Sequence, residues 1–336
     1  MKQRCIVIGF GWAGQRHARA VAACEVAELA AIVEWDAEKR EQAAAQYSVP
    51  VFAEIEDVLA GISFQTAIVA TLPTTHAELC GLLLKNGKHV LCEKPLSRNV
   101  GEVKQLAALA EKQGVQLGVV FNQRYGHVVQ MAKNLLSRDL SSRQLITASM
   151  YQNFPKEPQG HFGPNYLLTD SCCHLLDLMT YLIGPAVEGS AVGYQNQAGI
   201  CTNVAAVLQF ENGCVGTMAH SAWGGVLDTQ HPYQQIDIHT EQARYCIENT
   251  VGRLTVYPHG NEMRQVYEPS VFERRDYDLT LEMACQDYLR AVAAGKKAPV
   301  SVSDALQNAF MIEHLCSTMI KIYGKQGKEV RAASDK

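Results

Sequence analysis

The stretch IVIGFGWAGQRH, residues 6–17, decides the fold, because a short apolar run leads directly into glycines with the spacing G-x-G-x-x-G. In a strand, turn and helix unit, the first glycine permits a tight turn and the second lets the backbone approach a pyrophosphate. The third allows the helix and strand to pack closely. Free N–H groups at the start of the helix then favour an anion. The expected dinucleotide contacts are Gly9, Phe10, Gly11, Trp12, Ala13 and Gly14.

An acidic residue closes the next apolar run. Glu34 follows Gly14 by twenty residues, where a carboxylate can accept hydrogen bonds from the adenine ribose hydroxyls. A 2'-phosphate there would meet like charge, and the next residue is Trp35 instead of an arginine or serine, so the sequence favours NAD over NADP. Lys39 and Arg40 follow closely and could rescue NADP binding if their helix turned them inward.

The first 120 residues alternate short β-branched runs with alanine-rich helical segments. Strands are expected at residues 5–8, 29–33, 66–70, 88–91 and 116–121. Helices are expected over residues 14–24, 37–47, 75–86 and 100–113. This alternation predicts a parallel, doubly wound sheet with helices on both faces, the α/β Rossmann class, over residues 1–121.

The pattern changes after residue 121. A helix over residues 125–137 comes before longer alternating strands at 145–153, 202–210 and 215–222, which a helix over 167–183 interrupts. Strands without intervening helices predict an α+β domain with a large, mostly antiparallel, open-faced sheet over residues 122–301. Residues 302–325 are expected to form a helix that packs back on the first domain, and residues 326–336 a polar tail.

Composition excludes several classes of protein. The 336 residues carry a net charge of -4 and build no basic stripe for nucleic acid. The most apolar long stretch, residues 167–183, is broken by charged and imidazole side chains, so no membrane span is expected. The 11 cysteines form no CxxC pair and no zinc spacing, which indicates a reducing cytoplasm and no metal site. Cys172 and Cys173 are adjacent; buried apolar packing is the simpler interpretation, and a redox sensor is the alternative.

A lysine follows the apolar stretch at residues 89–92. In open α/β sheets, ligands bind outside the carboxyl ends of the strands, so Lys94 of the Glu93-Lys94-Pro95 sequence would point into the crevice between cofactor and substrate. A surface lysine after a strand is the alternative.

Four motifs together resemble the Gfo/Idh/MocA oxidoreductase family, the group of glucose-fructose oxidoreductase and inositol dehydrogenase. Residues 9–17, 70–76, 92–95 and 170–174 are similar to its opening, its loop near the nicotinamide, its Glu-Lys-Pro signature and its Asp-x-x-x-His. The resemblance covers almost the whole chain and implies a homodimer or homotetramer built on the open sheet face. Further cofactor contacts that it implies are Thr71, Leu72, Pro73, His76, Glu93 and Lys94.

The expected catalytic residues are Lys94, Asp170 and His174. Oxidation of a secondary alcohol needs a base, and an imidazole with an ordinary pKa of about 6.5 can serve in both directions. Lys94 would stabilise the forming alkoxide. Asp170 lies one helical turn before His174 and could orient the imidazole or the substrate. In the alternative, Asp170 and His174 are a satisfied pair on a helix surface.

Polar residues of the second half suggest a sugar or polyol substrate. Two departures from the family pattern leave its identity open: Cys172 stands where glycine is common, and residues 163–166 replace a glycine-rich stretch. The candidate substrate contacts, besides the catalytic residues, are Asn122, Arg124, Tyr151, Asn153, His161, Asn165, Tyr166 and His231.

The sequence thus indicates an NAD-dependent dehydrogenase that acts on a secondary hydroxyl of a sugar, sugar derivative or cyclitol. One alternative is a lyase, hydrolase or epimerase that oxidises its substrate transiently and keeps NAD tightly bound. Another is a sensor that binds a dinucleotide or sugar without catalysis, although a sensor has no need of Lys94 and His174.

Overall fold

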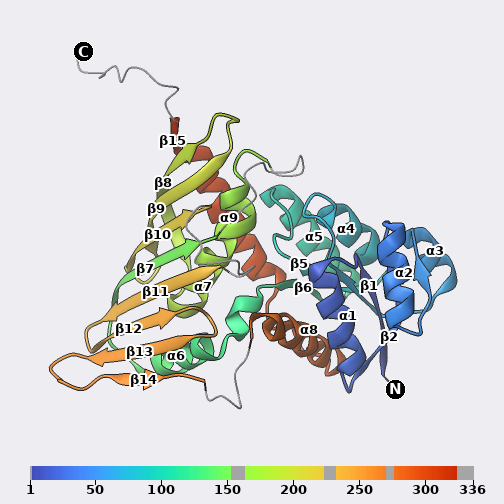
Figure 1. Cartoon of the computed structure of the whole chain (residues 1–336), viewed down its shortest axis with the longest axis horizontal. Coiled ribbons are helices and arrows are strands. Elements are labelled where there is room, and N and C mark those ends of the chain that lie inside the picture. Colours follow the sequence, from blue (N-terminus) through green and yellow to red (C-terminus); the bar gives the residue numbers. More distant parts are fainter. Residues whose placement is uncertain (1, 153–162, 223–231, 270–275, 324–336) are drawn as a thin grey trace.

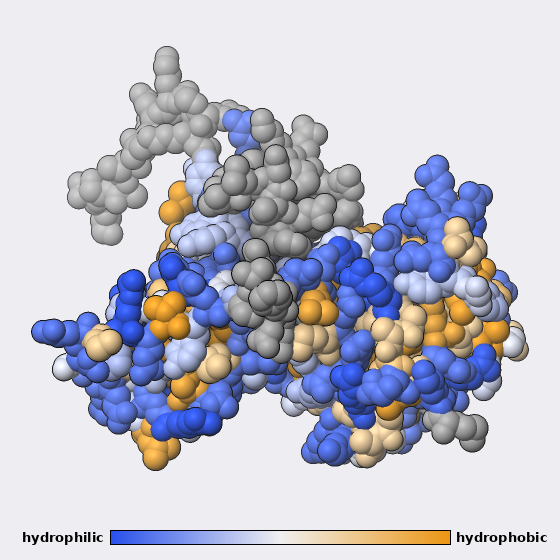
Figure 2. Space-filling model, turned by 60° about the horizontal axis from the view of Figure 1, so that its bottom comes forward, coloured by the Kyte–Doolittle hydropathy of each residue, from blue (hydrophilic) through white to orange (hydrophobic). Residues whose placement is uncertain are grey.

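A computed structural model describes residues 2–152, 163–222, 232–269 and 276–323. It contains two sheets, each with its own helices, at opposite ends of the molecule (Figure 1). On the face shown in Figure 2, hydrophilic residues predominate and hydrophobic residues occur in separate groups between them. Among the described residues, none of the helices combines the length and the apolar character needed to cross a bilayer.

The first sheet is parallel and has six strands in the order β3-β2-β1-β4-β5-β6. Its strands are β1 (Gln3–Ile8), β2 (Ala27–Val33), β3 (Val51–Phe52), β4 (Thr66–Val69), β5 (His89–Glu93) and β6 (Leu117–Val120). Its helices are α1 (Trp12–Ala23), α2 (Ala37–Gln46), α3 (Ile55–Gly61), α4 (His76–Lys85) and α5 (Val100–Gln113). The predicted Rossmann class is confirmed, and β3 and α3 are additions that the sequence patterns did not predict. The strand order reverses between β1 and β4, which places a crevice at their carboxyl ends.

The second sheet has nine strands in the order β14-β13-β12-β11-β7-β10-β9-β8-β15. Its strands are β7 (Arg143–Tyr151), β8 (Ala186–Gln195), β9 (Cys201–Phe210), β10 (Val215–Ser221), β11 (Tyr233–Thr240), β12 (Ala243–Glu248), β13 (Arg253–Pro258), β14 (Gln265–Tyr267) and β15 (Ile320–Tyr323). Only the β7–β10 and β8–β15 pairs are parallel, so the predicted mostly antiparallel sheet is confirmed. Buried and exposed residues alternate along β8, β9 and β10, as expected for a sheet with one covered face.

The inner face of this sheet is covered by helices that lie between it and the first domain (Figure 1). They are α6 (His127–Arg138), η2 (Leu167–Cys172, a π-helical turn), α7 (Cys173–Ile183) and α9 (Val302–Thr318). A short 3-10 turn, η1 (Asn122–Tyr125), joins the two halves. The helix expected over 302–325 ends at Thr318, and β15 then pairs with β8 in the second sheet.

Helix α8 (Tyr277–Ala293) packs on the first domain, although the expected division placed it in the second. It lies against α1, and its Cys285, Tyr288 and Leu289 belong to the core of the Rossmann sheet. Helix α9 contacts both α5 and β8, so it bridges the two domains. The chain after residue 276 therefore holds the domains together around the crevice.

Short polar side chains fix several helix starts. Asp36 accepts a hydrogen bond from the Lys39 backbone N–H at the start of α2, and Asn99 accepts one from Glu102 at the start of α5. Helix α5 ends at Gly114, whose φ of 66° lies in the left-handed region that glycine adopts at low cost. A capping box of Ser301 and Asp304 begins α9.

A buried ion network joins η1, α7 and α9. Arg124 Nε donates to Asp177 Oδ2 at 2.8 Å, and Nη2 donates to Asp177 Oδ1 at 2.6 Å and to Asp304 Oδ1 at 3.0 Å. The Arg124 guanidinium also lies 5.0 Å from the ring centre of Tyr181. Arg124 is 7% exposed, so its charge depends on these two carboxylates.

Replacing Asp177 with alanine is expected to lower the free energy of unfolding by about 3 kcal/mol, because it leaves a buried guanidinium with Asp304 as its one remaining carboxylate among the described residues. Urea unfolding monitored by circular dichroism measures this change. The exposed Glu111→Gln variant on α5 is the control. A midpoint for Asp177→Ala equal to that of the control would show that the network contributes no stability.

Candidate active site

A cavity of about 440 Å³ lies where the carboxyl ends of the Rossmann strands face the second domain. Nine of the side chains expected from the sequence line it together: Trp12, Leu72, Pro73, Glu93, Lys94, Asn122, Tyr166, Asp170 and His174. Its other lining residues are Met150, Gln152, Ser171, Pro232, Tyr277 and Leu281. Both domains therefore contribute to one site.

The glycine turn has the shape that a pyrophosphate needs. A Cβ at Gly14 would lie 1.9 Å from the Gly9 carbonyl oxygen, so helix α1 can approach the turn only with glycine there. A Cβ at Gly11 would meet no atom of the described part of the chain within 4 Å, which leaves space over the turn. Among the described residues, no side chain caps the start of α1, and the first turn of this helix has no acidic residue. The N–H groups of this helix start fit an anionic pyrophosphate.

The carboxylate of Glu34 is buried at the end of β2. It accepts hydrogen bonds from the Phe10 backbone N–H at 2.6 Å and from the Asp36 N–H at 2.9 Å. Glu34 thus fixes the glycine turn to the second strand, and its carboxylate lies at the end of that strand, as expected. The Trp35 side chain is exposed, and Arg40 Nη1 donates to the carbonyl oxygens of Glu34 and Trp35. Arg40 is therefore turned toward the carboxyl end of β2.

His76, an expected cofactor contact, is buried and joins two loops. Its Nδ1 lies 2.8 Å from the Pro95 carbonyl oxygen, and its Nε2 lies 3.2 Å from the Thr71 carbonyl oxygen. Burial lowers the pKa of His76, although both carbonyls oppose that shift. The imidazole ties the loop after β4 to the loop after β5, and it does not line the cavity. The position of His76 indicates that this residue stabilises the loops of the crevice.

Glu93 is held by a histidine of the first helix. Its Oε1 lies 2.9 Å from His17 Nε2, and its Oε2 accepts from the Lys94 backbone N–H at 3.3 Å. Burial alone would raise the pKa of Glu93, but the hydrogen bond and charge of His17 and the charge of Lys94 outweigh burial and lower it. An ionised Glu93 therefore lies beside Lys94.

The ammonium of Lys94 enters the cavity. Nζ donates to the backbone carbonyl oxygen of Asp170 at 2.7 Å and to no other atom of the described residues, so two N–H donors are left for a ligand. Burial alone would lower the pKa of Lys94, but nearby acidic groups, including Cys173, Glu93 and Asp170, raise it. Lys94 is therefore a cation at neutral pH.

His174 contributes an imidazole to the cavity. Its Nδ1 is buried without a hydrogen-bond partner among the described residues. The edge of its ring meets Phe121, with ring centres 6.4 Å apart. Burial, then the charges of Lys94 and His220, lower its pKa well below the usual value. The imidazole is thus neutral at pH 7 and can accept a proton.

The carboxylate of Asp170 does not contact His174. It pairs with Arg98, whose Nε donates to Oδ1 at 2.9 Å and whose Nη2 donates to Oδ2. Thr169 Oγ1 donates to the same Oδ1 at 2.7 Å. In these contacts Asp170 does not orient the imidazole, contrary to the prediction from the sequence. The i, i+4 spacing indicated a shared helix face, but the π-helical turn at this point changes the register.

Several expected substrate contacts lie elsewhere. Arg124 belongs to the buried network with Asp177. Tyr151 points to the opposite face of the sheet, where its ring stacks on Tyr233 with centres 6.3 Å apart. Side chains alternate along β7, so its neighbours Met150 and Gln152 line the cavity instead. Asn165 does not line the cavity. Three others lie outside the described residues, namely Asn153, His161 and His231.

Some functional candidates were missed in the sequence. Tyr277 begins α8, accepts a hydrogen bond from Gln123 Nε2 at 3.1 Å and lies 6.5 Å from the Trp12 ring centre. Asp276, a capping residue just before a helical pattern, was the available signal. The sequence signal for Arg98 was weaker, because only its position four residues after Lys94 indicated it. Cys172 and Cys173 are fully buried, and Cys172 Sγ lies 3.4 Å from His220 Nδ1.

This arrangement defines a class: a nucleotide-binding Rossmann domain whose strand ends, with a lysine, face a second domain that supplies a histidine. A family model described as "Oxidoreductase family, NAD-binding Rossmann fold" matches residues 3–121. A second family model, described as "GFO/IDH/MocA C-terminal domain", matches residues 129–245. The chain belongs to the Gfo/Idh/MocA oxidoreductase family, so the expected family and its nicotinamide cofactor are confirmed.

Among similar curated proteins, an inositol 2-dehydrogenase of Leifsonia xyli subsp. xyli is 30% identical over 194 residues, or 56% of each chain. This chain therefore spans just over half the length of that relative. A scyllo-inositol 2-dehydrogenase (NADP(+)) of Bacillus subtilis is 26% identical over 229 residues, 65% of this chain and 69% of the relative. In fold, the chain resembles an Agrobacterium radiobacter oxidoreductase solved with NAD+, L-tartaric acid and magnesium. That likeness has a TM-score of 0.85 at 17% identity and covers 95% of this chain and 96% of the other.

Proposed function

We propose that this protein is an NAD-dependent dehydrogenase that oxidises a secondary hydroxyl of a sugar, sugar derivative or cyclitol. The observation that carries the proposal is the meeting of a charged Lys94 and a neutral His174 in one cavity, beside Trp12, Leu72 and Pro73 of the dinucleotide side. The inositol dehydrogenases among its relatives support a cyclic polyol as the substrate.

In this proposal, Lys94 and His174 act on the same substrate oxygen. The neutral imidazole accepts the hydroxyl proton at Nε2, because Nδ1 is buried. The two free N–H donors of Lys94 stabilise the negative charge that develops on the oxygen. NAD, when bound in the open glycine turn, supplies the acceptor for the hydride. Asn122 and Tyr277 are placed to hold other hydroxyls of the substrate.

A substrate screen tests the proposal. The purified protein is mixed with a panel of inositols, aldoses, anhydrosugars and sugar acids, with NAD or with NADP, and absorbance at 340 nm is followed. We expect reduced nicotinamide with at least one cyclic polyol. If a panel that covers these classes gives no reduced nicotinamide, while a product still forms without added NAD, the transient-redox alternative replaces this proposal.

The choice between NAD and NADP is assigned to Glu34. Replacing Glu34 with glutamine removes the charge that would repel a 2'-phosphate, while Arg40 at the end of β2 is retained. The ratio of kcat/KM for NADP to that for NAD is expected to rise about tenfold, equivalent to about 1.4 kcal/mol. The exposed Glu38→Gln variant is the control. A ratio unchanged from wild type would remove Glu34 from cofactor selection.

We assign a homo-oligomeric interface to the outer face of the nine-stranded sheet. Described helices lie on the inner face only (Figure 1). Apolar side chains are exposed on the outer face of neighbouring strands: Val192, Tyr194, Val207, Val215, Ile320 and Ile322. A second copy of this chain would cover them.

Val207 lies near the centre of this surface, paired with Ser190 on one side and Thr217 on the other. Replacing it with arginine is expected to convert an oligomer to a monomer, because a charge would be buried between two apolar sheets. Light scattering after size exclusion measures the mass of wild type and variant. A monomeric wild type, or a variant of wild-type mass, would exclude this interface.

A further inference from the structure

We infer that Arg98 is a positioning residue of the active site: by pairing with the Asp170 carboxylate it keeps that carboxylate away from Lys94 and holds the Asp170 carbonyl on the Lys94 ammonium. This inference rests on the proposed function, because Lys94 is taken as the group that stabilises the alkoxide.

The two polar groups of Asp170 serve two different cations. The backbone carbonyl accepts from Lys94 Nζ at 2.7 Å, and the carboxylate accepts a two-point interaction from Arg98. Arg98 and Lys94 lie in the same loop after β5, and Asp170 lies in η2 of the second domain. One residue of the second domain is therefore held by two cations of the first.

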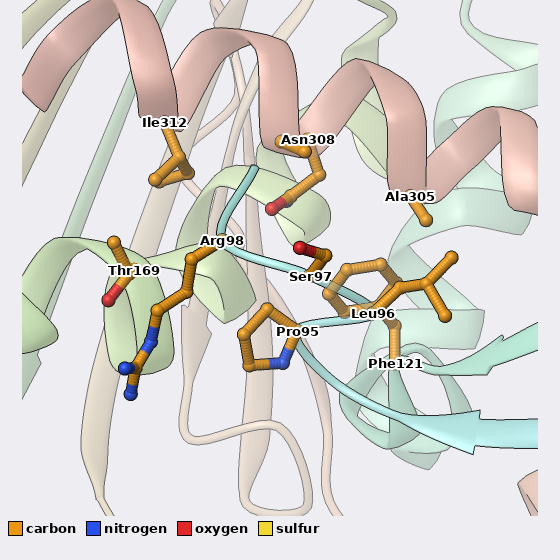
Figure 3. A pocket seen from close by; sticks show the side chains of 10 residues that line it. Pro95, Leu96, Ser97, Arg98, Phe121, Thr169, Ala305, Asn308 and Ile312 are labelled. Carbon is orange, nitrogen blue, oxygen red and sulfur yellow. The ribbon is translucent and has the colours of Figure 1, made fainter. Parts of the chain in front are cut away.

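The surroundings keep this pair in one arrangement. Figure 3 shows Arg98 beside Thr169 of the π-helical turn, with Pro95, Leu96 and Ser97 leading into it. The cavity among these residues and α9 has a volume of about 10 Å³, about the space of one water molecule. Arg98 therefore packs closely among these residues, next to the turn that carries Asp170. The side chains of Arg98 and Asp170 are 26% and 12% exposed, which protects their interaction from solvent.

Without Arg98, the Asp170 carboxylate could pair with another nearby cation, Lys94. Its own backbone carbonyl already contacts Lys94 Nζ, so a side-chain rotation brings a carboxylate oxygen to the ammonium. A planar guanidinium that takes both carboxylate oxygens opposes this rotation better than a single ammonium would. A Lys94–Asp170 ion pair would neutralise the charge that the substrate oxygen needs and would occupy its N–H donors.

This rearrangement would also alter His174. The imidazole is faced by Lys94 from the β5 loop and by His220 from β10, and Asp170 precedes it by one turn. A carboxylate that moves onto Lys94 cancels the nearest positive charge, so protonation of His174 becomes easier. The acid limb of kcat/KM in alcohol oxidation would then move to higher pH.

The first test does not depend on turnover. Reductive methylation of the whole protein with formaldehyde and dimethylamine borane at pH 8.5, read by peptide mass spectrometry, gives the rate at Lys94 relative to exposed Lys104. We expect Arg98→Met to slow methylation at Lys94 about tenfold, which corresponds to a rise of about one unit in its pKa. The Arg98→Met/Asp170→Asn double variant should regain the wild-type rate, because no carboxylate remains to pair with Lys94.

The second test uses the reaction. Arg98→Met should lower kcat about tenfold to a hundredfold with KM for NAD unchanged, and Arg98→Lys should recover part of the loss. The acid limb of kcat/KM should move to higher pH in Arg98→Met and return to its wild-type position in the double variant. Melting temperatures of Arg98→Met and Arg98→Lys that equal the wild-type value would exclude a folding defect as the cause.

Unchanged methylation of Lys94 in Arg98→Met, or slow methylation that persists in the double variant, would overturn the role of Arg98 whatever the activity. Full turnover of a Lys94→Met variant would instead refute the proposed function. The two failures are therefore distinguishable.

Discussion

Replacing Lys94 with methionine is expected to lower kcat for alcohol oxidation by about 10²- to 10³-fold, the usual effect of removing one preorganised donor from a developing oxyanion. Methionine keeps much of the length and apolar volume of the lysine stem but removes the charge and the three donors. The ammonium lies in the cavity, whereas the glycine turn and Glu34 lie in the nucleotide part of the crevice. The dissociation constant for NAD should therefore change little.

Stopped-flow absorbance with saturating substrate measures the loss, and titration calorimetry measures NAD binding. Lys104→Met, an exposed lysine on α5, is the matched control and should behave as wild type. A Lys94→Met enzyme with wild-type kcat would show that the lysine has no part in the chemistry. Equal losses of NAD affinity and kcat would assign it to the cofactor instead.

Replacing His174 with glutamine is expected to lower kcat/KM by about 10²- to 10⁴-fold, the range for loss of a general base. Glutamine can still hydrogen bond to the substrate at the position of Nε2, but it cannot accept the proton. The pH dependence supplies a second readout. Protonation of the imidazole abolishes its function, so the rate falls as the pH drops through the pKa of His174.

Burial and the charges of Lys94 and His220 lower that pKa, so the acid limb of the wild type should lie below pH 6.5 and the rate should be level from there to pH 8. In His174→Gln this limb should be absent. Rates at fixed ionic strength from pH 5 to 8 test the point, with exposed His259→Gln as the control. An acid limb in the variant identical to that of the wild type would assign the titration to another group.

The sequence was sufficient for the Rossmann domain because its signals are local. The glycine turn, the carboxylate of Glu34 and the buried runs of β1 and β4 each follow from short-range spacing. Two elements carried little local signal: β3 has only two residues, and α8 packs on α1, more than 250 residues earlier in the chain. A capping residue such as Asp276 can mark where α8 begins, but no local pattern shows that this helix packs on α1.

The site could be predicted in part for the same reason. Lys94 and His174 follow from motifs at the ends of regular elements, and both line one cavity. Tyr151 was misplaced because β7 alternates its side chains, so a shift of one residue exchanges the two faces. The partner of Asp170 was missed because it lies 72 residues away, in the other domain. The π-helical turn that separates Asp170 from His174 also leaves no mark in the residue spacing.

The most direct measurement is a crystal structure of the wild-type protein with NADH and an alcohol substrate from the screen, a complex that cannot turn over. Our account predicts that one hydroxyl oxygen of the substrate lies within hydrogen-bond distance of both Lys94 Nζ and His174 Nε2, with its carbon against the nicotinamide ring. A substrate whose hydroxyl reaches only one of these groups, or that binds with its carbon away from the ring, would contradict it.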